Sequence, residues 1–336
     1  MNNKYNFVDK NIFYEIDSDK IIYQDDNELV FLNIKSGKKK KFKSQELRKI
    51  KDNYFVSTEN FDRNKITILE IKNDDIKVIQ EIPFPKEIEF ENLLITVFNE
   101  ETLLFYTKSE DTSIYVYKKN KTNNNSLIYK LYQKISLEEE AHIYADTRIT
   151  RIFKLNQKEF FVYVICDQRP PTNSFIIQML NSNVQHKEAT YFAIYHLDEK
   201  NGKFKLKNSK VNLENLVDIE DDSLILNQKY FLYYANVGYD LQEYHILDIY
   251  NMKIIFTFHE VDNRTKLVDN FDNSNENNSK NFIIKNEDGC RQYEINDKEN
   301  EIKLIGVNSQ FFYQIRKFKS GILISVAEGI YFLKHE

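Results

Sequence analysis

The sequence predicts an all-β fold, and three observations support this prediction. Extended segments with apolar residues at every second position recur along the chain, and polar turns separate them. The aromatic residues are 22 Tyr and 25 Phe with no Trp, and such side chains suit the half-buried surface of a sheet. No long apolar stripe with helical spacing interrupts these segments.

The clearest antiparallel unit is the segment 190–207, which reads TYFAIYHLDEKNGKFKLK. Apolar and aromatic residues alternate between the two sides of an extended chain from Thr190 to Leu197. A polar reversal follows at Asp198–Gly202, and an alternating run from Phe204 to Lys207 returns. Period-two patterning that is broken by a glycine-containing turn predicts a β-hairpin.

Similar units recur, and each can be recognised by a strand that enters a polar turn. These marker strands lie at 29–34, 66–71, 113–117, 190–197, 243–249, 291–295 and 329–333. Two further apolar segments precede most of them, for example 92–98 and 102–106 before 113–117. The pattern predicts repeated four-stranded units in meander order.

The two ends of the chain complement each other in this scheme. Tyr5–Val8 is left over when the first unit is placed at 12–43, and the last unit lacks a fourth strand. We expect the N-terminal strand to supply the outer strand of the last unit, which closes a ring of units and removes its free edges.

With seven such units, the sequence resembles a divergent seven-bladed β-propeller, in the broad sense that includes WD-repeat-like and quinoprotein-like proteins. The resemblance is architectural, because the Gly-His and Trp-Asp signatures of WD repeats are absent. It implies one propeller domain over residues 1–336. Six blades or a pair of β domains are the alternatives.

Two segments depart from the repeat. An insertion at about 167–189 separates the second and third strands of blade four, where Pro170 and Pro171 stop a strand. Its apolar part, Ser174–Leu180, is expected to form a short helix or an extra hairpin arm. The second departure is the polar low-complexity loop at about 269–280.

Charge and composition exclude several classes of function. The net charge of −5 has mixed signs, so no basic surface for nucleic acid is expected, and the run Lys38–Lys41 is interpreted as a solvated strand or turn. No secretory signal pattern and no run of about 18 apolar residues is present. Cys166 and Cys290 match neither a zinc pattern nor a disulfide framework. We expect a soluble cytoplasmic protein without membrane contact.

No motif indicates catalysis. The six histidines have no ligand spacing, and the sequence contains no nucleophile elbow, phosphate-binding loop or dinucleotide fingerprint. We therefore expect no metal, no cofactor and no catalytic residue. His196 and His245, which lie in marker strands, are interpreted as structural, and Cys166 as a small buried residue.

Two stretches are candidates for partner binding, because exposed apolar and tyrosine-rich patches often mark interfaces. The first lies in the insertion and comprises Arg169, Phe175, Ile176, Ile177 and Met179. The second is the tyrosine-rich strand end 233–240, from which Tyr239 is selected. Folding back of the insertion as a lid, and ordinary packing of the tyrosines, are the alternatives.

The sequence thus favours a non-catalytic interaction or scaffold module that presents propeller loops to a protein partner, as a monomer or as a subunit of a larger assembly. The alternative is an enzyme or small-ligand-binding propeller that uses the polar mouth of the central channel. There, residues of several blades converge without forming a local motif.

Overall fold

The computed structural model contains strands and turns but no helix among the residues that it describes. The described residues are 4–5, 12–17, 20–25, 28–33, 36–44, 46–59, 65–72, 75–82, 93–107, 112–120, 128–137, 147–167, 188–216, 219–237, 241–261, 266–268, 281–286, 289–296, 301–308, 314–318, 321–326 and 329–334. No described helix is long and apolar enough to span a membrane.

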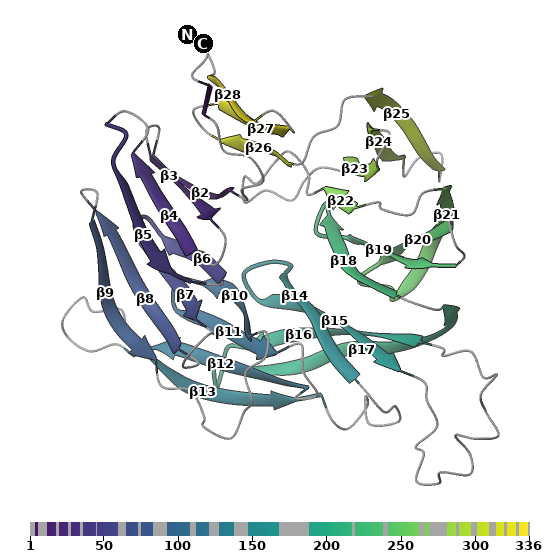
Figure 1. Ribbon diagram of the computed structural model, residues 1–336. Coiled ribbons are helices and arrows are strands. Elements are labelled where there is room, and N and C mark those ends of the chain that lie inside the picture. The colour runs from purple at the N-terminus through teal and green to yellow at the C-terminus, as the bar shows by residue number, and fades with distance from the viewer. Residues whose placement is uncertain are drawn as a thin grey trace, which may run out of the picture. The chain divides into compact units, whose positions relative to one another are not determined.

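The described strands form seven four-stranded sheets in which consecutive strands are neighbours, and in the last sheet β1 joins β28 (Figure 1). The first three sheets are β2 (Ile12–Asp17), β3 (Lys20–Asp25), β4 (Glu28–Asn33) and β5 (Lys39–Lys43); β6 (Glu46–Lys51), β7 (Tyr54–Glu59), β8 (Lys65–Lys72) and β9 (Asp75–Ile82); and β10 (Leu93–Asn99), β11 (Thr102–Thr107), β12 (Ser113–Lys119) and β13 (Tyr129–Ser136).

The next two sheets are β14 (Thr147–Lys154), β15 (Glu159–Asp167), β16 (Glu188–Asp198) and β17 (Lys203–Leu216); and β18 (Ile219–Leu226), β19 (Tyr230–Asn236), β20 (Leu241–Asp248) and β21 (Lys253–Val261). The last two are β22 (Lys266–Val268), β23 (Asn281–Asn286), β24 (Gly289–Asn296) and β25 (Glu301–Asn308); and β26 (Gln314–Phe318), β27 (Gly321–Val326), β28 (Gly329–Lys334) and β1 (Lys4–Tyr5).

The chain divides into two compact units, each described here by itself. The continuous unit spans Ile12–Glu214 and contains the first four sheets. The split unit combines Met1–Asn11 with Asn215–Glu336 and contains the other three sheets.

The predicted marker strands all occur, as β4, β8, β12, β16, β20, β24 and β28. The predicted pairing of the two chain ends is confirmed, since Lys4 faces Tyr331 and Tyr5 faces Ile330 in the outer pair of the last sheet. The sequence pattern predicts neither β22 nor β23, because β22 has only three residues and β23 follows a long polar stretch.

A β-bulge recurs where the third strand of a sheet meets the fourth. The register shifts between Ile68 and Leu69, Val116 and Tyr117, Ile246 and Leu247, and Gln292 and Tyr293. An extra residue in the outer strand bends that strand and increases its twist.

Glutamine side chains at two of these bulges join successive sheets of the continuous unit. Gln80 donates from Nε2 to the carbonyl oxygen of Tyr129 at 3.0 Å and accepts from its backbone N–H at 2.8 Å. Gln133 makes the same pair of bonds with Phe204, both at 2.9 Å. Each amide thus satisfies one donor and one acceptor of the next outer strand, as a further strand would.

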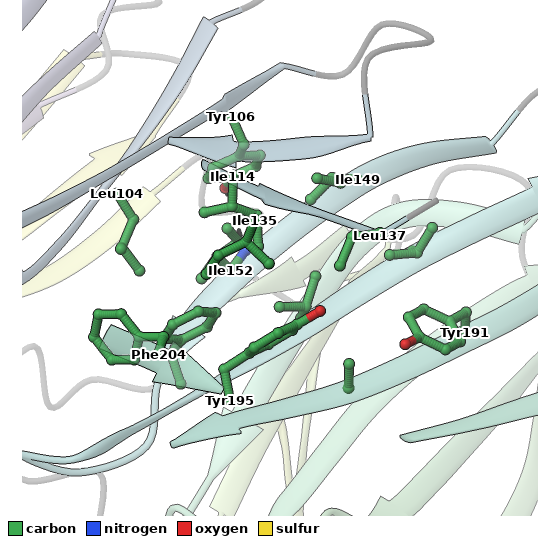
Figure 2. Close-up of a cluster of buried hydrophobic side chains, with 14 of the residues drawn as sticks. Leu104, Tyr106, Ile114, Ile135, Leu137, Ile149, Ile152, Tyr191, Tyr195 and Phe204 are labelled. Carbon is green, nitrogen blue, oxygen red and sulfur yellow. Dashed lines mark hydrogen bonds between the residues drawn. The ribbon is translucent and has the colours of Figure 1, made fainter. Parts of the chain in front are cut away.

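Aromatic side chains fill the core between the third and fourth sheets of the continuous unit (Figure 2). The Phe160 ring stacks on Tyr195 with centroids 5.2 Å apart, and it meets Phe204 edge-on at 4.9 Å. Phe98 meets Phe204 edge-on at 5.0 Å. Such pairs stabilise the core beyond the burial of their area, so the aromatic content of the sequence is used between sheets.

The split unit has an equivalent aromatic core between the sheets β18–β21 and β22–β25. Phe258 stacks on Tyr244 at 5.1 Å, and Phe282 stacks on Tyr293 at 5.2 Å. An ionic contact lies beside it, in which the Glu260 carboxylate binds both the Arg291 guanidinium and the Tyr293 hydroxyl.

Candidate functional site

The insertion predicted at about 167–189 lies between two regularly paired strands, β15 and β16. β15 and β16 are paired without a register shift from Glu159 opposite His196 to Asp167 opposite Glu188. Residues 168–187 lie outside the described residues. Their two attachment points are therefore directly opposite each other at the end of a continuous ladder.

The base of the insertion is buried. Cys166 and Ala189 face each other across the ladder and both are fully buried. Burial raises the pKa of the Cys166 thiol to about 11, although a hydrogen bond with Thr147 opposes the shift. The thiol is therefore protonated at neutral pH, and the prediction of a small buried cysteine is confirmed.

The selected partner-binding residues, Arg169, Phe175, Ile176, Ile177, Met179 and Tyr239, all lie outside the described residues. The strands on either side nevertheless show which connection each segment belongs to. The insertion connects the second and third strands of its sheet, and Tyr239 lies in the corresponding connection between β19 and β20. The two candidate stretches therefore occupy the same position in two sheets that are consecutive along the chain.

Two tyrosines of the tyrosine-rich strand end are core residues. Tyr233 is fully buried and stacks on Phe231 and His245, with centroids 5.6 and 5.0 Å away. Tyr234 is buried and stacks on Tyr244 at 5.0 Å. For these two residues the interpretation as ordinary packing is correct.

A polar cluster joins three successive sheets in the continuous unit. The Glu46 carboxylate of β6 accepts the backbone N–H of Ile95 in β10 at 2.9 Å and lies 2.5 Å from the Arg48 guanidinium. Burial raises the pKa of Glu46, while Arg48 and Arg151 of β14 oppose that shift. Tyr106 accepts the N–H of Ile152 at 3.3 Å, and burial raises its pKa to about 12.

This cluster is the part of the described chain that most resembles a ligand site. A buried carboxylate with a raised pKa beside two arginines can exchange a proton or bind a polar group. The same contacts also hold three sheets together, which is a structural role. No group of three or more His, Cys, Asp or Glu residues within the described ranges could hold a metal ion.

A second cluster lies in the split unit, on β20 and β21. The Glu243 carboxylate is 3.0 Å from His245 Nε2 and 2.8 Å from His259 Nε2. His245 is buried, and desolvation lowers its pKa, with Glu243 opposing and His259 assisting the shift. The imidazole of His245 packs in the core, as the sequence predicted. His196, in contrast, is partly exposed and lies 3.5 Å from Glu159.

Outer strands form the exposed edges of the sheets, and they differ in chemistry. The basic run Lys38–Lys41 is exposed at the start of β5, as predicted. β17 carries exposed lysines at 203, 205, 207 and 210. β25 instead exposes three large apolar side chains, those of Leu304, Ile305 and Val307.

The sequence analysis missed the Glu46 cluster, the Glu243 cluster and the apolar edge. Glu46 with Arg48, and Glu243 with His245, are i, i+2 pairs that share one side of a strand, so a search for charged pairs within strands could have found them. The contact of Glu46 with Ile95 depends on strand positions that are distant in sequence. The run Leu-Ile-Gly-Val at 304–307 breaks the period-two pattern, and that break was the available signal.

Comparisons with known proteins identify the fold. No protein-family model matches the chain, and no curated protein matches it in sequence. Among solved structures, a chain of the mitotic checkpoint complex is similar with a TM-score of 0.53 and 6% identity, over 97% of this chain and 87% of that chain. A protein from Lactobacillus plantarum has a TM-score of 0.51 and 11% identity, over 94% and 86%.

A further similar structure is the β-propeller domain of the trilobed protease from Pyrococcus furiosus, which has an open velcro topology. Its TM-score is 0.49 with 11% identity, over 95% of this chain and 93% of that chain. Identities this low show the fold alone. The repeated four-stranded meanders, together with the similarity to the two structures with TM-scores of 0.53 and 0.51, show a divergent all-β propeller fold, which confirms the predicted fold class.

Proposed function

We propose that the protein is a non-catalytic interaction module that presents the segment 168–187 to a protein partner. The observation that supports this proposal most directly is the unbroken β15–β16 ladder, which ends with Asp167 opposite Glu188. A propeller fold is compatible with this role, since a chain with a similar fold belongs to the mitotic checkpoint complex. A fold alone does not imply a function.

The ladder offers a physical reason for using this segment. Its two ends are fixed next to each other by paired strands, and the base is closed by the buried pair Cys166 and Ala189. Binding to a segment with anchored ends costs less conformational entropy than binding to a free tail. Phe175, Ile176, Ile177 and Met179 supply apolar contacts in this proposal, and Arg169 supplies a polar one. Tyr239, in the connection between β19 and β20, is a second and separate candidate contact.

The experiment replaces 168–187 with Asn-Gly, because a two-residue turn joins directly paired antiparallel strands. The control replaces 121–127, a polar connection that is closed by a 2.6 Å bond from the Asn120 N–H to the Ile128 carbonyl oxygen. Both variants and the wild type are used as bait in native lysate, with circular dichroism to confirm folding. A partner that is lost only from the 168–187 variant supports the proposal. Equal capture by all three proteins would refute it.

Point variants then test the named residues. Phe175→Ala together with Ile177→Ala is expected to weaken binding of the captured partner at least tenfold, because buried apolar anchors dominate interface energy. Tyr239→Ala is expected to have a smaller effect. Titration calorimetry with the purified partner measures both.

A second candidate function is binding of a small anionic ligand at the Glu46 cluster. Glu46, Arg48 and Arg151 supply the observation that favours it, since their charges interact at a site built from separate sheets. Thermal unfolding in the presence of a panel of carboxylates and phosphates tests this candidate. A stabilisation that Arg151→Ala removes would support it, and no stabilisation by any compound would count against it.

A further inference from the structure

The outer strand β25 has an apolar edge that the propeller fold itself does not require. It pairs with β24 and with no other strand among the described residues. The exposed fractions are 53% for Leu304, 46% for Ile305 and 68% for Val307. An outer strand with unpaired backbone groups and apolar side chains is a template for pairing with another strand.

Charge distinguishes β25 from the lysine-rich outer strands. β5 carries lysines at 39, 40, 41 and 43, and β17 carries them at 203, 205, 207 and 210. Lysine on an edge strand opposes pairing with a second copy, because like charges then face each other. On β25 the charged residues Glu301 and Lys303 form an ion pair with each other at 2.9 Å. The strand therefore presents no net charge to an identical strand.

We propose that two copies of this chain associate by pairing β25 of one copy antiparallel with β25 of the other. The inference concerns a different surface from the segment 168–187, and it does not depend on the proposed function. The two four-stranded sheets would become one continuous eight-stranded sheet across a twofold axis.

The β-bulge selects the register of this pairing. Ile302 and Leu304 lie opposite Ile295 and Tyr293, and after the extra residue Ile305, Val307 lies opposite Arg291. Alternation along β24 therefore places Ile302, Leu304 and Val307 on one side of the sheet. Glu301, Lys303, Gly306 and Asn308 lie on the other side by the same counting.

Two identical strands pair well only in a register in which residues from the same side of the sheet face each other. If Leu304 of one copy faces Ile305 of the other, Ile302 faces Val307, and Lys303 faces Gly306. Apolar residues then meet apolar residues, and glycine leaves room for the lysine stem. A shift by one residue places Ile302 opposite Gly306 and Glu301 opposite Val307, so that the two sides no longer match.

The expected dimer is weak. Stable interfaces bury about 1,200–2,000 Å² in total, and two eight-residue strands contribute only part of such an area. We therefore expect an average mass that doubles with increasing protein concentration and returns to that of one chain on dilution.

Analytical ultracentrifugation of the full chain tests the proposal. Ile305→Lys places charge at the twofold axis and is expected to leave one chain at every concentration. Leu206→Lys is the matched control, because Leu206 lies on the outer strand β17 with a comparable exposed fraction of 44%, and it is expected to leave association unchanged. Both substitutions are at exposed positions, so circular dichroism is expected to show intact folds.

Cross-linking tests the register separately. Leu304→Cys combined with Ile305→Cys, with Cys290→Ser to remove a competing thiol, is expected to give a disulfide-linked dimer on mild oxidation. Leu206→Cys, combined only with Cys290→Ser, is expected to stay a single chain under the same oxidation. A wild-type protein that is monomeric at millimolar concentration overturns the proposal, and so does a dimer that Ile305→Lys does not affect. A monomer that binds a different protein through β25 also overturns it, in favour of a heterologous strand.

Discussion

The sheets β14–β17 and β22–β25 repeat one geometry with different chemistry. The first receives the Gln133 amide from the preceding sheet, and the second receives the carboxylate of Glu260. The outer strand of the first is lined by lysines, and that of the second exposes apolar residues. The comparison teaches that the fold fixes strand order, while the contacts between sheets and the edges are free to differ.

The largest effects are expected in the aromatic cores, where the two regions are most alike. Phe160→Ala in the continuous unit and Phe282→Ala in the split unit are each expected to lower the free energy of unfolding by about 3–5 kcal/mol, because each leaves a cavity among packed rings. Urea unfolding followed by tyrosine fluorescence and circular dichroism measures both. A cost below about 1 kcal/mol for either variant would contradict the core described here.

Variants of the contacts between sheets are expected to distinguish the sheet β14–β17 from the sheet β22–β25. Gln133→Leu is expected to cost about 1–3 kcal/mol, since it leaves the N–H and C=O of Phe204 without their partners. Gln133→Glu keeps the acceptor and loses the donor, so its cost should be intermediate at neutral pH. Gln80→Leu is the matched substitution one sheet earlier and should behave like Gln133→Leu.

The ionic contact of Glu260 and the neutral contact of Gln133 are expected to respond differently to salt concentration. Glu260→Gln is expected to cost about 1 kcal/mol, because its partner Arg291 is partly exposed and solvent screens the pair. Its cost should fall in 1 M NaCl, whereas the cost of Gln133→Leu should not. Equal salt sensitivity of the two variants would contradict the assignment of one contact as ionic and the other as neutral.

The buried ionisable groups predict opposite responses to pH. Glu46 has a raised pKa, so its contribution to stability is greatest below its ordinary value of 4.5 and decreases as pH rises through the folded-state pKa. His245 has a lowered pKa, so its contribution is present above 6.5 and is lost as pH falls through the folded-state pKa.

Thermal unfolding from pH 4 to pH 8 measures both responses. Glu46→Gln should gain stability relative to wild type as pH rises, and His245→Asn should gain relative stability as pH falls below 6.5. Unchanged pH profiles for both variants would show that neither group titrates differently in the folded protein.

The smallest change in stability is expected at the lysine-lined edge. Lys205→Val removes an exposed ion pair with Asp198 and should leave the urea midpoint almost unchanged. It should nevertheless increase self-association, because β17 then resembles β25 more closely. Light scattering at increasing concentration measures this effect, and a variant that remains as monodisperse as wild type would contradict a protective role of that lysine.

Local patterns were sufficient to predict most strands but not the contacts between sheets. The alternation in 190–197 and the turn at Asp198–Gly202 defined β16 and the start of β17, since period and turn chemistry act over a few residues. Gln133 in contrast looks like any exposed polar residue, because its partner Phe204 belongs to another sheet. The same limit concealed the contact between Glu46 and Ile95.

The candidate partner-binding segment stays a prediction, because its residues lie outside the described ones. The prolines and the unusual spacing predicted the insertion, and the β15–β16 ladder ends with Asp167 opposite Glu188. The burial of Tyr233 and Tyr234 depends on Phe231, His245 and Tyr244, which the sequence alone could not place around them. Tyr233 and Tyr234 are therefore core residues, whereas Tyr239 lies outside the described residues.

The pairing of β1 with β28 has a consequence for the time course of synthesis. Residues 12–214 are complete on the ribosome while the partner strand of β1 does not yet exist. At about 5–20 residues per second, the N-terminal strand waits on the order of 6–25 s after the continuous unit has emerged. During that interval it is a nascent segment without its partner, open to chaperones. The residues of β1 are thus translated before the continuous unit but acquire their native neighbours after it.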